Sequence, residues 1–195
     1  YLADYVNYDE VNKFIRCNMA VVCGLDYKLV DDEKLVRIPM IIREHLLTPR
    51  GLRTLSPRNL LYKSNYNEDQ RSQDLASRNG SAWIWPLTLF VKACFDIAGE
   101  KYVEDAKRIL EAFDDELQTK CVGSLSERFE GDPPHSPRGS VSHATSVGAL
   151  LYINSLVERY AAKKPARKST AKKATAECAT EEKPKRKCVR KSTKK

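Results

Sequence analysis

The sequence lacks the short motifs that mark several common protein classes. No two of its six cysteines stand in C-x-x-C spacing, so neither a disulfide framework nor a zinc site is indicated, and a reducing compartment is expected. There is no Gly-rich phosphate loop and no G-x-S-x-G motif. We find no signal peptide and no apolar run of the roughly 18 residues that a membrane helix needs. These absences favour a cytoplasmic protein without a membrane span.

Metal ligands are also scarce. His135 and His143 could titrate or bind a metal, but no third ligand is suitably spaced. A lone histidine is more often structural, and we therefore expect neither a metal nor another cofactor.

An excess of positive charge is lacking outside the C-terminal tail. Residues 161–195 carry 14 Lys/Arg and three Glu, a net charge of +11, whereas residues 1–160 carry 20 Lys/Arg and 23 Asp/Glu, a net charge of −3. A mildly acidic body does not favour a nucleic-acid-binding fold. The tail cannot bury enough apolar surface to offset its chain entropy, so we predict that it is disordered. It either contacts polyanions or simply aids solubility.

Apolar residues recur at helical spacing in about five segments, and no convincing strand pair is visible. The segments are residues 11–23, 31–47, 83–98, 103–117 and 141–160. We therefore predict an all-α domain over residues 1–160, with Gly24 and Gly99 ending two of the helices. Residues 51–82 show little periodicity, and a connection this long is usually functional or disordered.

The segment 125–139 is the least helix-like passage of this domain. It holds three prolines, two glycines, three acidic residues, two arginines and His135. Prolines fix the backbone angle φ, and loops between helices often carry function because the scaffold positions them. A plain surface connection is the alternative.

Glu127, in this segment, is our candidate catalytic carboxylate. Hydrolysis of a glycosidic bond needs two carboxyl groups, of which one protonates the leaving oxygen and the other activates water or attacks the sugar. Glu130 and Asp132 are nearby alternatives. Glu127 and Glu130 are too close in sequence to be placed confidently across a substrate, so the second carboxyl is expected from elsewhere in the fold.

Trp83 and Trp85 lie where a polar connection meets the start of a helix. Aromatic rings at the rim of a cleft can stack on sugars, although core packing is the simpler explanation for at least one of the two. Arg16 and Asn18 are polar residues in an otherwise apolar segment, and they face either a cleft or solvent.

Two motifs resemble the C-terminal glucosidase domain of bacterial and archaeal glycogen debranching enzymes, the amylo-α-1,6-glucosidase family. They are Gly51-Leu52-Arg53-Thr54-Leu55-Ser56-Pro57 and Ser126-Glu127-Arg128-Phe129-Glu130-Gly131-Asp132-Pro133-Pro134-His135-Ser136-Pro137-Arg138-Gly139. The similarity covers most of residues 1–160, and Tyr1-Leu2-Ala3-Asp4-Tyr5-Val6 is similar to the strand-like lead-in of that family. The tail lies outside it.

The resemblance implies the C-terminal part of an (α/α)6 barrel, with inner and outer rings of helices and a cleft at one end. It also implies hydrolysis of the α-1,6-linked glucose at branch points of glycogen or a related glucan, with inversion. Glu127 then corresponds to the general base, and the general acid is an aspartate upstream of this chain. We predict substrate contacts from six residues: Arg16, Asn18, Trp83, Trp85, Asp132 and His135.

The sequence departs from the family pattern at several positions expected to line the sugar pocket. The family has R-P-N-Q, Y-H-x-G-x-V-W-P-W and Q-A-W-S where this chain has Arg16-Cys17-Asn18-Met19, Ser77-Arg78-Asn79-Gly80-Ser81-Ala82-Trp83-Ile84-Trp85 and His143-Ala144-Thr145-Ser146. Each lost hydrogen bond to a sugar hydroxyl weakens transition-state binding. Two alternatives therefore stay open: a catalytically degenerate homologue that keeps the fold and perhaps glucan binding, and an interaction protein that acts through its basic tail.

Overall fold

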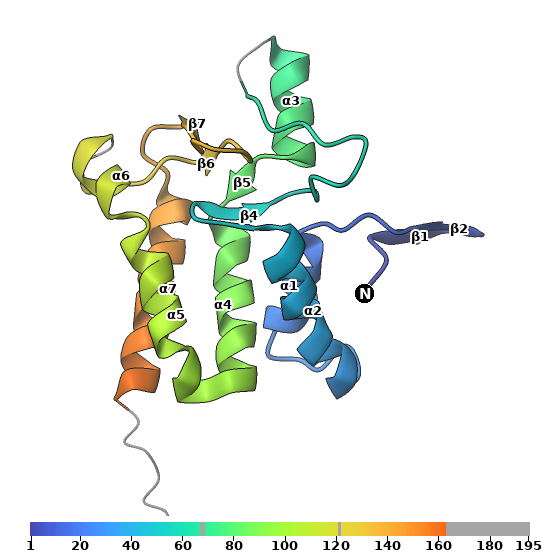
Figure 1. Ribbon diagram of the computed structural model, residues 1–195, viewed down its shortest axis with the longest axis horizontal. Helices are drawn as coiled ribbons and strands as arrows, with labels where there is room; N and C mark the ends of the chain where they lie inside the picture. Colours follow the sequence, from blue (N-terminus) through green and yellow to red (C-terminus); the bar gives the residue numbers. More distant parts are fainter. Residues whose placement is uncertain (67–68, 121, 163–195) are drawn as a thin grey trace, which may run out of the picture. The chain divides into compact units, whose positions relative to one another are not determined.

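The computed structural model describes residues 1–66, 69–120 and 122–162 (Figure 1). Seven α-helices and one 3-10 helix lie in these described residues. They are α1 (Asn18–Gly24), α2 (Asp32–His45), α3 (Gln70–Asn79), α4 (Trp85–Ala98), η1 (Gly99–Tyr102), α5 (Val103–Glu111), α6 (Asp114–Thr119) and α7 (Ala144–Ala161).

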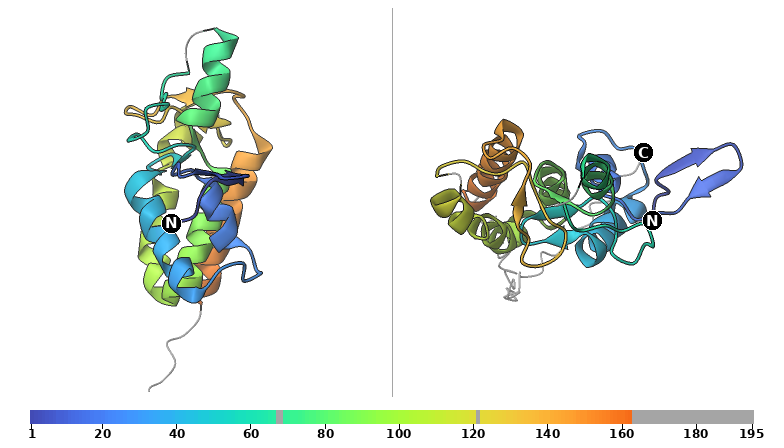
Figure 2. Two further views of the ribbon diagram at one scale, coloured as in Figure 1. Left: turned by 90° about the vertical axis from the view of Figure 1, so that its right-hand side faces the viewer. Right: turned by 90° about the horizontal axis from the view of Figure 1, so that it is seen from above.

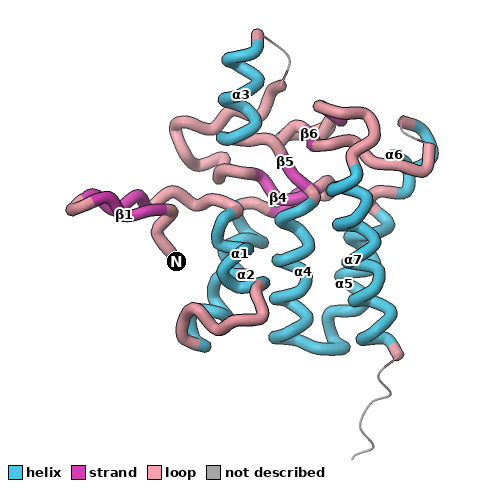
Figure 3. Tube along the Cα trace, turned by 180° about the vertical axis from the view of Figure 1, so that it is seen from behind, coloured by secondary structure: helices cyan, strands magenta, loops and turns pink. Residues whose placement is uncertain are grey.

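Helix α4 is the centre of the helical layer. It packs against α1, α2 and α7, and α5 packs against α7; Figures 1 and 3 show α4, α5 and α7 side by side. Four of its apolar side chains are at most 1% exposed, namely Leu87, Phe90, Val91 and Phe95. Burying each such side chain contributes roughly 1.5–3 kcal/mol. Pro86 is tolerated because it stands in the first turn, where its missing N–H has no helical partner.

Among the described residues, a five-stranded antiparallel sheet has the order β3-β4-β5-β6-β7. Its strands have two or three residues each: β3 (Leu47–Thr48), β4 (Gly51–Arg53), β5 (Ala82–Trp83), β6 (Arg128–Phe129) and β7 (Pro137–Arg138). In Figures 1 and 3 this sheet lies at one end of α4, α5 and α7, with α3 on its other side. It therefore brings residues from distant parts of the sequence to that end of the helices.

A second, two-stranded sheet is formed by β1 (Tyr5–Asn7) and β2 (Glu10–Asn12). Its register pairs Tyr5 with Asn12 and Val6 with Val11. This hairpin stands out from the helices in the view from above (Figure 2), and the chain enters it from Asp4, a residue of the site described below.

The prediction of an all-α domain is wrong, because helices and two sheets are combined. The strands of the larger sheet are too short to show the alternation of apolar and polar residues that marks a strand in a sequence. Their pairing also joins residues far apart in the chain, such as Ala82 with Phe129. Whether the helices belong to an (α/α)6 barrel stays a prediction.

Three further predictions of secondary structure are wrong. The single helix predicted over residues 103–117 is divided into α5 and α6. The first half of the helix predicted over residues 11–23 is instead β2 and irregular chain, and α1 begins only at Asn18. The supposedly irregular region 51–82 contains β4 and α3. Helix α3 shows no apolar stripe because its buried face consists of the small residues Ser72 and Ala76. Its start is instead marked by Asp69, whose carboxylate accepts a hydrogen bond from the Ser72 N–H at 3.0 Å.

Several helix boundaries are confirmed. Helix α1 ends at Gly24, and α4 ends just before Gly99, which has a φ of +56° that favours glycine. The last predicted helix corresponds to α7. The predicted disordered tail, residues 161–195, falls almost entirely outside the described residues, and the domain boundary at residue 160 stays a prediction.

Candidate functional site

A cleft of about 660 Å³ lies where the N-terminal segment, α3 and the start of α4 meet. Four of the six predicted substrate-binding residues line it: Arg16, Asn18, Trp83 and Trp85. Asp4 and Ser77 are among the other lining residues, which the sequence did not single out for binding. Side chains from distant positions are thus combined into one polar and aromatic wall.

Arg16 organises one side of this cleft. Its Nε pairs with the Asp4 carboxylate at 3.1 Å, and its two terminal nitrogens donate to the Arg78 carbonyl at 2.7 Å and to Asn79 Oδ1 at 3.0 Å. The Asn18 amide donates to the other Asp4 oxygen at 2.7 Å. Arg16 and Asn18 therefore both line the cleft, and Asp4 holds both in place.

The two tryptophans differ in their surroundings. Trp83, in β5, donates from its ring N–H to the Ser77 carbonyl at 3.3 Å, so its ring is fixed against α3. Trp85, in the first turn of α4, is 38% exposed. An exposed aromatic ring at the edge of a cleft is available for stacking.

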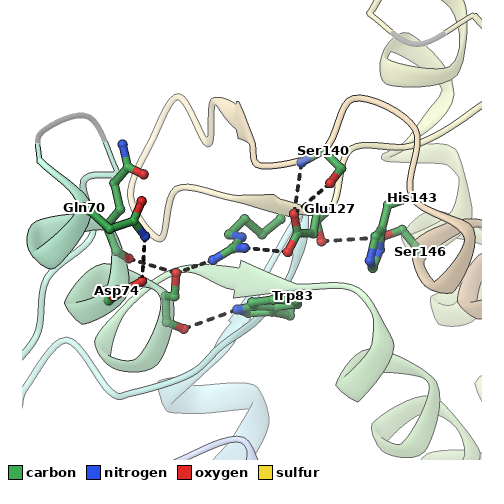
Figure 4. A network of polar contacts seen from close by, with 10 residues as sticks. Gln70, Asp74, Trp83, Glu127, Ser140, His143 and Ser146 are labelled. Atoms are coloured by element: carbon green, nitrogen blue, oxygen red, sulfur yellow. Dashed lines mark hydrogen bonds and ion pairs between the residues drawn. The ribbon is translucent and has the colours of Figure 1, made fainter.

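Glu127, immediately before β6, is held from both sides (Figure 4). Its Oε2 accepts from the Ser140 N–H at 2.9 Å and from the Ser140 hydroxyl at 3.2 Å. Its Oε1 pairs with the guanidinium of Arg128. Its backbone N–H donates to the Ser140 carbonyl at 3.0 Å. The carboxylate is therefore fixed in orientation, and its side chain is only 17% exposed.

This environment sets the charge of Glu127. Burial alone would raise the pKa of the carboxyl group, but the Ser140 N–H and the positive charge of Arg128 outweigh burial and hold the pKa below its usual value of 4.5. The group is consequently ionised near neutral pH. It can accept a proton but cannot donate one.

Arg128 connects Glu127 to the cleft. Strand pairing places Arg128 directly opposite Trp83, and its guanidinium carbon lies 4.5 Å from the centre of the Trp83 ring and 4.8 Å from that of Tyr66. The guanidinium also donates to the Ser77 hydroxyl. Trp83 and Ser77 line the cleft, so Glu127 is linked to the wall of the cleft through a single side chain.

Asp132 and His135 lie in the same motif as Glu127, and within the described part of the chain none of these three residues lines this cleft. Asp132 accepts from the Tyr62 hydroxyl at 2.8 Å, and burial is the main reason why the pKa of that phenol is raised. His135 Nδ1 lies 3.0 Å from the Glu130 carbonyl. The Tyr62 contact joins the 125–139 loop to the segment before α3, whereas the His135 contact lies within the loop. A substrate contact from Asp132 or His135 stays a prediction.

Residues 125–139, the motif loop, pack closely against β4 and the end of α3. The Arg53 side chain donates to the Gly131 carbonyl at 2.8 Å, and a Cβ added at Gly131 would overlap the Gly80 carbonyl. Glu130, 9% exposed, accepts two hydrogen bonds from Arg138 at 2.9 and 3.1 Å. Glu130 is thus ion-paired with Arg138, as Glu127 is with Arg128.

Within the described residues, no group of three or more His, Cys, Asp or Glu side chains could hold a metal ion. No helix in this part of the chain has the length and apolar content to cross a bilayer. Cys17, Cys23 and Cys94 are buried free thiols. Burial raises the pKa of Cys17 and Cys23 to about 12 and that of Cys94 to about 11, so they behave as small apolar side chains.

Sequence reasoning missed Asp4, Ser77, Arg128 and Ser140 as parts of the site. Asp4 lies in the lead-in segment already noted for its resemblance, and Ser77 at one of the positions that depart from the family pattern. Arg128 and Ser140 carry no periodic signal. Their roles depend on strand pairing and loop contacts that the sequence alone does not reveal.

Comparison with known proteins agrees with the motifs. A family model described as amylo-alpha-1,6-glucosidase matches residues 1–152. The chain therefore belongs to the amylo-alpha-1,6-glucosidase family, as the resemblance indicated. No curated protein matches the sequence significantly.

Proposed function

We propose that this chain is the part of a glycogen-debranching glucosidase that supplies the general base. The reaction is hydrolysis of α-1,6-glucosidic branch points in glycogen or a related glucan, with inversion at the anomeric carbon. Family membership supports a glucosidase of this type acting on a glucan. The single observation that carries the assignment of the base is the fixed, ionised carboxylate of Glu127.

Glu127 has the properties that a base in an inverting mechanism requires. Such a base must be deprotonated and must orient one water molecule toward the anomeric carbon. Among the described residues, Oε2 accepts two hydrogen bonds from Ser140, whereas Oε1 accepts only from Arg128. A carboxylate oxygen can accept about two hydrogen bonds. Oε1 is therefore the oxygen on which we place the attacking water.

The cleft offers chemistry suited to a sugar. Trp85 presents a partly exposed ring, and Arg16 and Asn18 supply polar atoms along the same wall. Aromatic faces stack on the apolar faces of pyranose rings, while amide and guanidinium groups donate to hydroxyl groups. We place a glucose unit of the branch in this cleft.

The complementary general acid is proposed to come from a segment outside this chain. In an inverting pair the two carboxyl groups lie roughly 6.5–9.5 Å apart so that water fits between them. We further propose that the helices belong to an (α/α)6 barrel and that the enzyme acts in the cytoplasm.

The test is replacement of Glu127 by glutamine in the full-length protein. Glutamine preserves the shape of the side chain but cannot accept the proton, so turnover of a branched α-1,6-glucosidic substrate is expected to fall by about 10² to 10⁴-fold, the usual contribution of a general base. The measurement is glucose release, with the melting temperature as a check on folding.

Glu130→Gln is the matched comparison, since it removes an acid from the same motif. It weakens the pair with Arg138 and should lower the melting temperature while leaving turnover of the folded enzyme within a few fold. Near-normal glucose release by Glu127→Gln would contradict the assignment of the base.

Glucan binding without catalysis is the second candidate. It is favoured by the departures at Met19, Ser77, Arg78, His143 and Thr145, which replace residues expected to contact sugar. This alternative predicts that a branched malto-oligosaccharide changes the tryptophan fluorescence while the unsubstituted full-length protein releases no glucose.

A further inference from the structure

Arg128 occupies an unusual position for an arginine next to a candidate base. Its side chain is only 12% exposed, and it lies over the rings of Tyr66 and Trp83 at 4.8 and 4.5 Å. Its remaining polar contacts go to the Glu127 carboxylate and the Ser77 hydroxyl. A buried guanidinium with aromatic rings and two polar partners has few alternative positions.

The contacts of Arg128 come from three separate segments. Tyr66 precedes α3, Ser77 lies in α3, and Trp83 lies in β5 directly opposite Arg128 in the strand register. Figure 4 shows the resulting chain of contacts from α3 through the guanidinium to Glu127 and on to Ser140 and Ser146. Through Arg128, Glu127 is thereby connected to Ser77 and Trp83 in the wall of the cleft.

From this geometry, we propose that Arg128 is a positioning residue that stabilises the Glu127 carboxylate by direct contact, fixes its orientation and couples it to the Ser77–Trp83 wall of the cleft. This role rests on the proposed function of Glu127 as the base. A purely structural arginine would stabilise the fold equally without controlling the protonation of Glu127. The two possibilities are therefore separable by experiment.

The lowered pKa of Glu127 agrees with this role, because the positive charge of Arg128 is among the causes of the shift, after burial and the Ser140 N–H. Other titratable or charged groups lie in the surrounding elements. His143 precedes α7 and bonds to the Ser146 hydroxyl at 3.1 Å, which itself donates to the Glu127 carbonyl. Arg138 of β7 is paired with Glu130, and Asp74 of α3 bonds to Gln70.

The Tyr66 phenol completes this set. Arg138, Asp74 and Tyr66 contact partners other than Glu127, and His143 reaches Glu127 only through Ser146 and the Glu127 backbone carbonyl. Arg128, by contrast, contacts the carboxylate directly. Among the charged side chains of the described residues, it is the one expected to govern the titration of Glu127.

The experiment is a pH titration of the Glu127 carboxyl carbon by NMR, in the unsubstituted chain and in Arg128→Gln. Removing the positive charge should move the titration midpoint of Glu127 to higher pH, because the ionised form loses its partner. Arg128→Lys keeps a charge but not the planar stacking, so its midpoint should lie between the two. The readout does not depend on turnover, so it stays informative whether or not Glu127→Gln abolishes activity.

Arg50→Gln is the matched control. Arg50 is 16% exposed in its side chain, pairs with Asp115 at 2.6 Å, and lies over Phe113 and Phe129 at 5.9 and 5.7 Å. Its loss removes a similarly buried, ring-stacked and ion-paired arginine that does not contact Glu127. It should lower the melting temperature without moving the Glu127 midpoint.

Two results would overturn the proposal. One is a folded Arg128→Gln protein in which Glu127 titrates as in the unsubstituted chain. The other is an equal shift in Arg50→Gln, which would show that loss of any such arginine perturbs the site. If Arg128→Gln does not fold, the proposal is tested in the unsubstituted chain. The NMR resonances of the Arg128 guanidinium should then change with the same pH midpoint as the Glu127 carboxyl carbon. Separate midpoints would refute the coupling.

Discussion

Gly139 lies against the carboxylate of Glu127, and its residue type follows from that contact. Its φ of +76° lies in the left-handed region, and a Cβ at this position would overlap Glu127 Oε2. A side chain here would therefore be strained by the backbone and would also push the carboxylate away from Ser140. Because glycine has no Cβ, Glu127 Oε2 can occupy this position next to Ser140.

Gly139→Ala should accordingly destabilise the fold and displace the Glu127 carboxylate. The left-handed backbone alone costs roughly 1–2 kcal/mol for a residue with a Cβ, and displacement of the carboxylate adds to it. Gly123→Ala is the control, because Gly123 has a similar φ of +80° but open space around its Cβ position. Urea unfolding of both variants should show the larger loss for Gly139→Ala, and equal losses would mean that the contact with Glu127 carries no energy.

Single residues were only partly predictable from the sequence. Arg16, Asn18, Trp83 and Trp85 were selected for their chemical type or family motif, and all four line one cleft. The partner residues were not predictable, because Asp4 and Arg128 are charged side chains of ordinary appearance. Their importance arises from what lies opposite them in space, which depends on pairings across long stretches of chain.

Helix α4 owes its position to a cluster of aromatic contacts. The Phe95 ring is stacked on Tyr160 at 4.5 Å between centroids and meets Tyr102 edge-on at 5.4 Å. These contacts tie α4 to η1 and to the last turns of α7.

Phe95→Ala should therefore destabilise the fold by roughly 3–5 kcal/mol, the usual cost of deleting a buried phenylalanine. Ile97→Ala in the same helix is the control, since Ile97 is 46% exposed and its truncation should change stability by no more than about 0.5 kcal/mol. Chemical denaturation monitored by far-UV circular dichroism measures both. A cost for Phe95→Ala as small as that for Ile97→Ala would show that the aromatic cluster does not hold α4.

The elements differ in how well the sequence predicted them, for a physical reason. Helices α2, α4 and α7 bury apolar stripes, and the periodicity of such stripes is visible in a sequence. Helix α3 buries only small residues, and the sheet strands contain too few residues to show a pattern. Their formation is decided by tertiary contacts, and for this reason an all-α domain was predicted where a mixed one exists.

Charge is distributed unevenly over the whole chain. The net charge of −3 on residues 1–160 contrasts with +11 on residues 161–195. Helix α7 ends at Ala161 and keeps Tyr160 stacked on Phe95, so its packing is complete before most of the basic segment begins. Stability and electrostatic contacts with polyanions are therefore expected to reside in different parts of the chain.

Deletion of residues 163–195 tests this separation. The melting temperature and any binding of a branched α-glucan should stay unchanged, while binding to a polyanion such as polyphosphate, measured at increasing salt, should weaken strongly. Deletion of residues 160–195, which also removes the ring stacked on Phe95, should lower the melting temperature. An equally large loss of stability in the shorter deletion would show that the basic segment packs against the body.

The larger sheet has a consequence for how the molecule folds. Its strand pairs close long loops, such as the one between Leu52 and Trp83 and the one between Ala82 and Phe129, and closing a long loop carries an entropic cost before any contact is made. Local contacts within helices form sooner than such distant pairings. The helices are thus expected to form before Arg128 meets Trp83, so a newly made or partly refolded chain acquires its helical content first and the contact between Arg128 and Trp83 last.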